Sequence, residues 1–228
     1  MLKAALVVVM IGIVAGVLLQ TGTDEHSMIK RNIYLYTMYH THVYAAGQEA
    51  FVNSTILAMH THPNNTDLQG AACWSLGRIA AKKYNSHAKT GRVKISAAGG
   101  LERIIEAMGN HSNSLDVQHY GAFALFHLAD NDENQLMISV LGGVEQLMSA
   151  MQNYSTHRQI QEFSCGALGN IAVNPINQVK IATLGGIELI LHAMQMHKSD
   201  VHVQRQGCFA LMTIADNVAG NQVSLYVF

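Results

Sequence analysis

Apolar side chains recur every three or four residues along most of the chain, which is the spacing of one buried face of an α-helix. The segment "VQRQGCFALMTIA" places Val203, Gly207, Ala210, Leu211 and Ile214 on such a face. The segment "GGIELILHAM" has the same spacing over a shorter length. Between such segments, stretches like "NQVKIATLGG" are amphipathic for one or two turns and stop at glycine, which ends helices and permits a sharp corner. The pattern predicts a succession of short helices.

These helical segments form a tandem repeat. Three Gly-Gly pairs end at Gly100, Gly143 and Gly186, each 43 residues after the last. Other positions keep the same register, with 49 residues between the first two units: Met59, Met108, Met151 and Met194; Gln69, Gln118, Gln161 and Gln204; Leu76, Leu125, Leu168 and Leu211. Each unit is predicted to hold a short helix, a glycine corner, a second helix, a loop and a third helix. Since no unit can bury its apolar stripe alone, stacked units are expected to form an α-solenoid.

The unit resembles an armadillo repeat, in which "GGI" opens the second helix and "ALGNIA" closes the third. The two-helix HEAT repeat is the near alternative, but it lacks this glycine corner. The resemblance covers about residues 47–222 and implies an all-α, right-handed solenoid of three-helix repeats. It also implies a concave groove lined by the third helices that binds an extended peptide or a partner protein, without catalysis.

The resemblance further indicates which residues line the groove. Importin-like members carry Trp-x-x-x-Asn on each third helix, where the asparagine clamps a peptide backbone. The matching pairs here are Trp74/Arg78, Phe123/His127, Gly166/Asn170 and Phe209/Thr213, and one turn earlier stand Gly70, His119, Glu162 and Arg205. Only Asn170 keeps the clamp and only Trp74 the aromatic wall. The mixture suits protein recognition through a few anchors better than a regular ladder for a basic peptide. Packing against neighbouring repeats is the alternative role for Trp74, Phe123 and Phe209.

Composition narrows the class of protein. Charged residues make up 13% of the chain and the net charge is −1, which argues against nucleic acid as a partner. We found no phosphate-binding loop, nucleophile elbow or His-Glu-x-x-His motif, so we expect no enzyme activity, cofactor or small-molecule substrate. Three cysteines cannot form a closed disulfide framework, which favours a reduced compartment. Cys73, Cys165 and Cys208 share one repeat position and are expected to be small buried residues.

Thirteen histidines raise the alternative of a metal-binding protein. His60 and His62 have the His-x-His spacing of some zinc and copper sites. The repeat alignment places a ring at the position of His62 in every unit: His62, His111, Tyr154 and His197. A ring that recurs in the loop between the second and third helices is expected to pack over the helix ends.

The two ends and one insertion depart from the repeat. Residues 1–22 contain sixteen apolar residues, Ala4 to Leu19, which are borderline for a membrane anchor or signal segment. Residues 23–49 are expected to be a degenerate first repeat, 50–222 the solenoid, and 223–228 a truncated start of a further repeat. The insertion between Ala80 and Gly99 carries six basic residues, as a solvated loop or as a rim for an acidic partner: Lys82, Lys83, His87, Lys89, Arg92 and Lys94.

The sequence therefore predicts a cytoplasmic, non-enzymatic adaptor that binds a partner protein in its groove. A membrane-tethered adaptor using residues 1–20 is the alternative within the same class.

Overall fold

The computed structural model describes residues 45–81 and 87–216 of the 228-residue chain. Every regular element in these two ranges is an α-helix. The helices are α3 (Ala45–Thr61), α4 (Thr66–Ala80), α5 (Ala88–Ala97), α6 (Gly100–Asn110), α7 (Leu115–Leu128), α8 (Asp132–Val140), α9 (Gly143–Asn153), α10 (Arg158–Ile171), α11 (Pro175–Thr183), α12 (Gly186–Met196) and α13 (Val201–Ala215).

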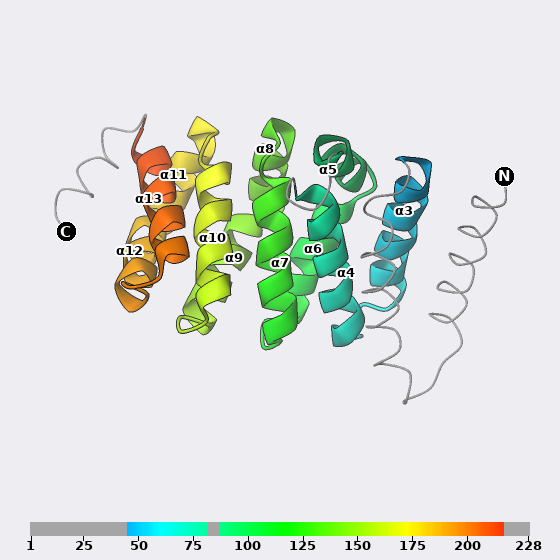
Figure 1. Cartoon of the computed structure of the whole chain (residues 1–228), viewed down its shortest axis with the longest axis horizontal. Helices are drawn as coiled ribbons and strands as arrows, with labels where there is room; N and C mark the ends of the chain where they lie inside the picture. The colour runs from blue at the N-terminus through cyan, green and yellow to red at the C-terminus, as the bar shows by residue number, and fades with distance from the viewer. Residues whose placement is uncertain (1–44, 82–86, 217–228) are drawn as a thin grey trace.

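The helices stack as repeats in one elongated array (Figure 1). The third helices α4, α7, α10 and α13 stand side by side along one face, and each packs against the next. The second helices α3, α6, α9 and α12 lie behind them, and the short first helices α5, α8 and α11 line the upper edge. The predicted all-α solenoid of three-helix repeats is confirmed.

A glycine pair makes the corner between the first and second helices. Gly142 has φ of 86°, in the left-handed region where a side chain would be strained. A Cβ on the following Gly143 would lie 2.5 Å from Cγ2 of Ile138, so α8 and α9 can meet only at a glycine. The same corner recurs at Gly99 and Gly185, whose φ angles are 82° and 84°.

The third helices pack closely because aromatic rings face glycines on the adjacent helix. Phe123 of α7 lies over Gly77 of α4, where a Cβ would be 2.6 Å from the ring. Phe209 of α13 lies over Gly169 of α10 in the same way, at 2.7 Å. Small and large side chains therefore alternate across the stack, as dense interiors require.

The glutamine of each repeat ties the second helix to the third. Gln118 is buried, and its Nε2 donates to the backbone oxygens of Met108 and His111 at 2.7 and 3.1 Å. The other three repeats make the same pair of bonds through Gln69, Gln161 and Gln204. In each repeat one bond satisfies the methionine carbonyl near the end of the second helix, and the other adds a donor to a loop carbonyl that already accepts a backbone N–H.

The recurring loop ring joins successive repeats. Nε2 of His111 lies 2.7 Å from the backbone oxygen of Pro63 in the preceding loop. The Tyr154 hydroxyl donates to Ser112 O at 3.2 Å, and Nε2 of His197 lies 2.8 Å from Ser155 O. The ring at this position thus contacts the loop of the preceding repeat. Its packing over the helix ends stays a prediction.

Two expectations about individual residues were wrong. Cys208 is exposed, whereas Cys73 and Cys165 are buried, because α13 is the last described helix and is covered on one side only. Arg92 is not part of a surface loop: it lies in α5, is 3% exposed, and its Nη2 is 2.7 Å from Oδ2 of Asp130.

The remaining boundary predictions lie mostly outside the described residues. Residues 1–44, 82–86 and 217–228 include the apolar amino-terminal segment, Lys82 and Lys83 of the insertion, and the expected start of a further repeat. Helix α3 begins at Ala45, so the expected boundary at residue 50 falls inside a helix. Within 45–81 and 87–216, no helix has the length and apolar character needed to cross a membrane.

Candidate functional site

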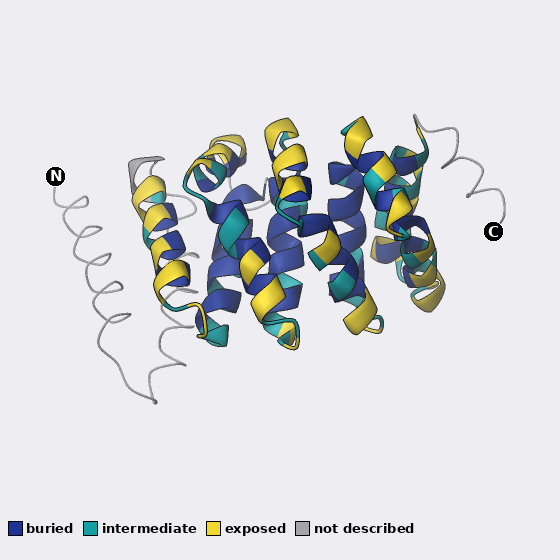
Figure 2. Ribbon diagram, turned by 180° about the vertical axis from the view of Figure 1, so that it is seen from behind, coloured by how far each residue is buried: buried dark blue, intermediate teal, exposed yellow. Residues whose placement is uncertain are grey.

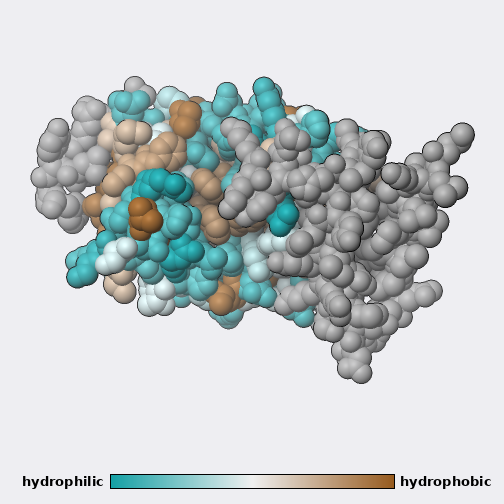
Figure 3. Space-filling view, viewed as in Figure 1, coloured by the Kyte–Doolittle hydropathy of each residue, from teal (hydrophilic) through white to brown (hydrophobic). Residues whose placement is uncertain are grey.

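The predicted groove residues come from four helices, α4, α7, α10 and α13, which form a single face of the molecule (Figure 1). We call this surface the third-helix face and define it by ten residues: Trp74, Arg78, His119, Phe123, His127, Glu162, Asn170, Arg205, Phe209 and Thr213. Figure 3 has the same view, and hydrophobic and hydrophilic residues are interspersed where described residues are visible. The mixture differs from the continuous apolar core beneath.

On α4, Trp74 and Arg78 form a stacked pair. Four residues apart, they occupy one side of the helix, and Cζ of Arg78 lies 4.9 Å from the centroid of the indole ring. Both residues are half-buried. A cation held over an aromatic face offers a partner both a charge and a flat apolar surface.

The centre of the face is an aromatic cluster shared by α7 and α10. The His127 ring lies 4.8 Å from Phe123 and 4.7 Å from Phe126, and Phe163 lies 5.2 Å from Phe123. The His119 ring stacks on Phe163 at 5.8 Å. Phe123 is only 8% exposed, so most of its surface serves packing between repeats.

Sequence reasoning did not include Phe126 and Phe163 in this cluster. Phe126 directly precedes the selected His127, and Phe163 directly follows the selected Glu162. The signal that could have found them is the glycine at the facing position, because a Cβ on Gly166 would lie 2.7 Å from the Phe126 ring. A large residue in one unit opposite a glycine in the next indicates contact across the repeat boundary.

The two histidines of the cluster are held neutral. Burial lowers the pKa of His119 to about 4, helped by the nearby His157 and Arg158 and opposed by Asp116. Burial likewise lowers the pKa of His127 to about 4, with Arg92 acting in the same direction and Asp130 against it. Near neutral pH these rings are therefore uncharged, and each can donate or accept a hydrogen bond.

Asn170, the residue that matches the family's clamp, already has a bond within the protein. Its Nδ2 donates to the backbone oxygen of Phe126 on α7 at 3.0 Å. The second hydrogen of Nδ2 is then a donor, and the side-chain oxygen an acceptor, for a bound partner. Asn170 therefore links two third helices as well as facing the predicted groove.

Charged residues gather toward the beginning of α10 and α13. Glu162 accepts from Nη1 of Arg158 at 2.9 Å and lies 3.7 Å from Nδ1 of His202. Arg205 is exposed. Thr213 is half-buried, and its hydroxyl donates to Phe209 O at 2.9 Å.

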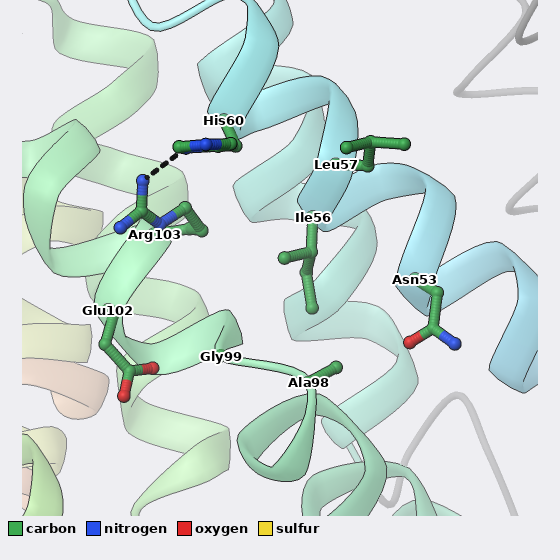
Figure 4. A pocket seen from close by; sticks show the side chains of 8 residues that line it. All are labelled: Asn53, Ile56, Leu57, His60, Ala98, Gly99, Glu102 and Arg103. Carbon is green, nitrogen blue, oxygen red and sulfur yellow. Dashed lines mark hydrogen bonds between the residues drawn. The ribbon is translucent and has the colours of Figure 1, made fainter.

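A separate hollow lies between α3 and α6, away from the third-helix face (Figure 4). His60 points across it, and its Nδ1 lies 3.1 Å from Nη1 of Arg103. Ile56 and Leu57 provide an apolar wall. Because Arg103 is a permanent cation that occupies this ring nitrogen, it opposes metal binding there.

The described ranges contain no group of three or more His, Cys, Asp or Glu residues placed to hold a metal ion. His60 contacts Arg103, whereas His62 lies in the loop after α3, and its backbone oxygen accepts from Nε2 of Gln69 at 3.0 Å.

Stacked three-helix units with a glycine corner define the chain as an α-solenoid repeat protein. The family model for the armadillo/β-catenin-like repeat matches residues 131–173, which hold the Asn131 cap and helices α8 to α10. Protein aardvark of Dictyostelium discoideum is 32% identical over 87 residues, a match that spans 37% of this chain and 12% of that protein. The crystal structure of an engineered protein from the Northeast Structural Genomics Consortium superposes with a TM-score of 0.70 at 23% identity, over 90% of this chain and 78% of the other, and shows the same fold. Residues 131–173 are thus similar to an armadillo/β-catenin-like repeat, and the whole described array has the fold of a helical repeat protein.

Proposed function

We propose that the protein is a non-enzymatic interaction module whose third-helix face binds an extended peptide or a helix of a partner protein. An armadillo-repeat solenoid is consistent with an interaction scaffold. The observation that carries the finer proposal is the composition of this face, where aromatic rings and cations remain partly accessible on helices whose inner sides are buried.

The face offers anchors of several kinds along the array. Trp74 and Arg78 provide a stacked cation at one end, and Arg205 provides an exposed cation at the other. Between them stand the neutral imidazoles of His119 and His127. Aromatic and arginine side chains are the residue types that dominate binding energy at protein interfaces.

The experiment compares a variant on the third-helix face with a matched variant elsewhere. Arg205→Glu with Thr213→Glu changes two residues of the face, and Lys198→Glu with Ser199→Glu changes two exposed residues of the α12–α13 loop by the same net charge. Each immobilised protein would capture partners from an extract of the cells that express it, and the captured proteins would be quantified by mass spectrometry.

We expect the third-helix variant to lose at least tenfold of its captured partner while the loop variant keeps it, with both melting temperatures close to that of the wild type. Equal capture by all three proteins would contradict binding through this face.

A further inference from the structure

A second surface of the molecule, on the first helices, is exposed and apolar. Val140 of α8 is 73% exposed and Ile176 of α11 is 69% exposed. The α8–α11 apolar surface consists of six such side chains: Leu136, Met137, Val140, Val173, Ile176 and Val179. It lies along the upper edge of the array, where Figure 2 shows exposed residues on these short helices.

The two helices hold this surface as one rigid unit. Nδ2 of Asn177 donates to Gln135 O at 3.1 Å, and Nζ of Lys180 donates to Ser139 O at 2.7 Å, so α11 is bonded directly to α8. Ile138 is fully buried on the inner side of α8. The side chains on the outer sides of α8 and α11 therefore face solvent together.

Repeat stacking does not require apolar residues here. On α5, the positions equivalent to Leu136, Met137 and Val140 hold Val93, Lys94 and Ala97, so that repeat folds with a charged and a small residue at two of the three positions. Clustered exposed apolar side chains of this kind mark interaction sites on soluble proteins. The surface is also separate from the third-helix face, which is built from α4, α7, α10 and α13.

The charges beside the surface select the kind of partner. Asp132 and Glu133 are exposed in the first turn of α8, and α8 contains no lysine or arginine. The single cation of α11, Lys180, is bonded to Ser139 O and lies 2.8 Å from Oε1 of Glu145. An anionic lipid surface would be repelled by Asp132 and Glu133, whereas lysine or arginine on a partner protein would be complementary to them.

We propose that the α8–α11 apolar surface binds an amphipathic helix of a partner protein whose apolar side is flanked by lysine or arginine. Packed helices lie about 8–10 Å apart, and a helix rises about 1.5 Å per residue. A partner helix crossing both α8 and α11 therefore meets them with apolar residues about five to seven positions apart. The basic side chains beside those anchors face Asp132 and Glu133.

The test uses a phage-displayed library of helical peptides selected on the full chain. Peptides that also bind the Val140→Lys, Ile176→Lys double variant are removed by counter-selection, which discards binders of the third-helix face. Binding of the remaining peptides is then measured by fluorescence anisotropy with the wild type, the double variant and a control. The control, Val201→Lys with Met212→Lys, adds the same charge at two exposed apolar residues of α13.

The expected peptides share apolar residues at i, i+3, i+4 and i+7 with lysine or arginine beside them. Their affinity should fall at least tenfold in the double variant and remain unchanged in the control, with circular dichroism showing all three proteins folded. Failure to recover any peptide after counter-selection would overturn the proposal, as would acidic flanks on the recovered peptides. Binding of the wild type, but not of the double variant, to vesicles with 30% phosphatidylserine would also overturn it in favour of a membrane.

Discussion

His127 shows how the repeat packing tunes a single side chain. Its ring is enclosed by Phe123 and Phe126, and burial together with Arg92 lowers its pKa to about 4. Spacing along α7 predicts that His127 shares a stripe with Phe123. It does not predict the neutral state, because that depends first on burial of the ring and then on Arg92, which belongs to α5.

The lowered pKa of His127 has a consequence for stability. The unfolded chain protonates this histidine near pH 6.5 and the folded protein near pH 4, so the unfolded state binds more protons between these values. Stability should therefore fall as the pH decreases from 6.5 to 4. Between pH 7 and 4.5, urea unfolding should show the wild type losing about 2 kcal/mol more than His127→Gln.

His192→Gln is the matched control, since His192 is an exposed histidine of α12. It should lose as much stability as the wild type over the same pH range. If His127→Gln lost as much as both of them, the imidazole would not be the group responsible.

Asn170 marks the limit of sequence reasoning at the residue scale. Its position matches the family's peptide clamp, and the match is a property of the sequence alone. The bond from Nδ2 to Phe126 O depends on how close α10 comes to α7, which is set by the facing glycines and rings. Its role in binding a partner stays a prediction.

At the scale of the elements, the repeat register predicts the helices well. Each glycine pair marks the corner between the first and second helices, and the structure gives positive φ to the first glycine of each described pair. The insertion was harder to interpret, because its basic residues suggest a solvated loop. Its second part instead forms α5. Arg92 of this helix stands where the later first helices have Gln135 and Gln178, and it donates to the backbone oxygens of Ala80 and Asp130.

The repeat glutamine provides a test of how the second and third helices are joined. Gln118→Ala leaves the backbone oxygen of buried Met108 without its side-chain donor, whereas His111 O keeps the bond from Ser114 N. We expect the free energy of unfolding to fall by about 1–3 kcal/mol. Gln152→Ala, at an exposed position of α9, should change it by less than about 0.5 kcal/mol in the same chemical denaturation experiment. Similar losses in the two variants would mean that the bonds of Gln118 contribute little.

At the scale of the whole molecule, periodicity predicts the solenoid because stacking is the means by which every unit buries its apolar stripe. The exposure of a residue depends on the position of its repeat within the array, which periodicity alone does not predict. Cys73, Cys165 and Cys208 share a repeat position, yet only the cysteine of the last described repeat is exposed. The α8–α11 apolar surface was also missed, since its residues have helical spacing but face outward.

Site-specific photo-cross-linking tests the central claim, binding through the third-helix face, most directly. A benzophenone amino acid would be incorporated at the position of Arg205 or Thr213, and in a control at Leu57, which is 60% exposed on the second helix α3. After irradiation in cells, we predict a covalent partner adduct from positions 205 and 213 and none from position 57. An adduct from position 57, with none from the other two, would contradict the account.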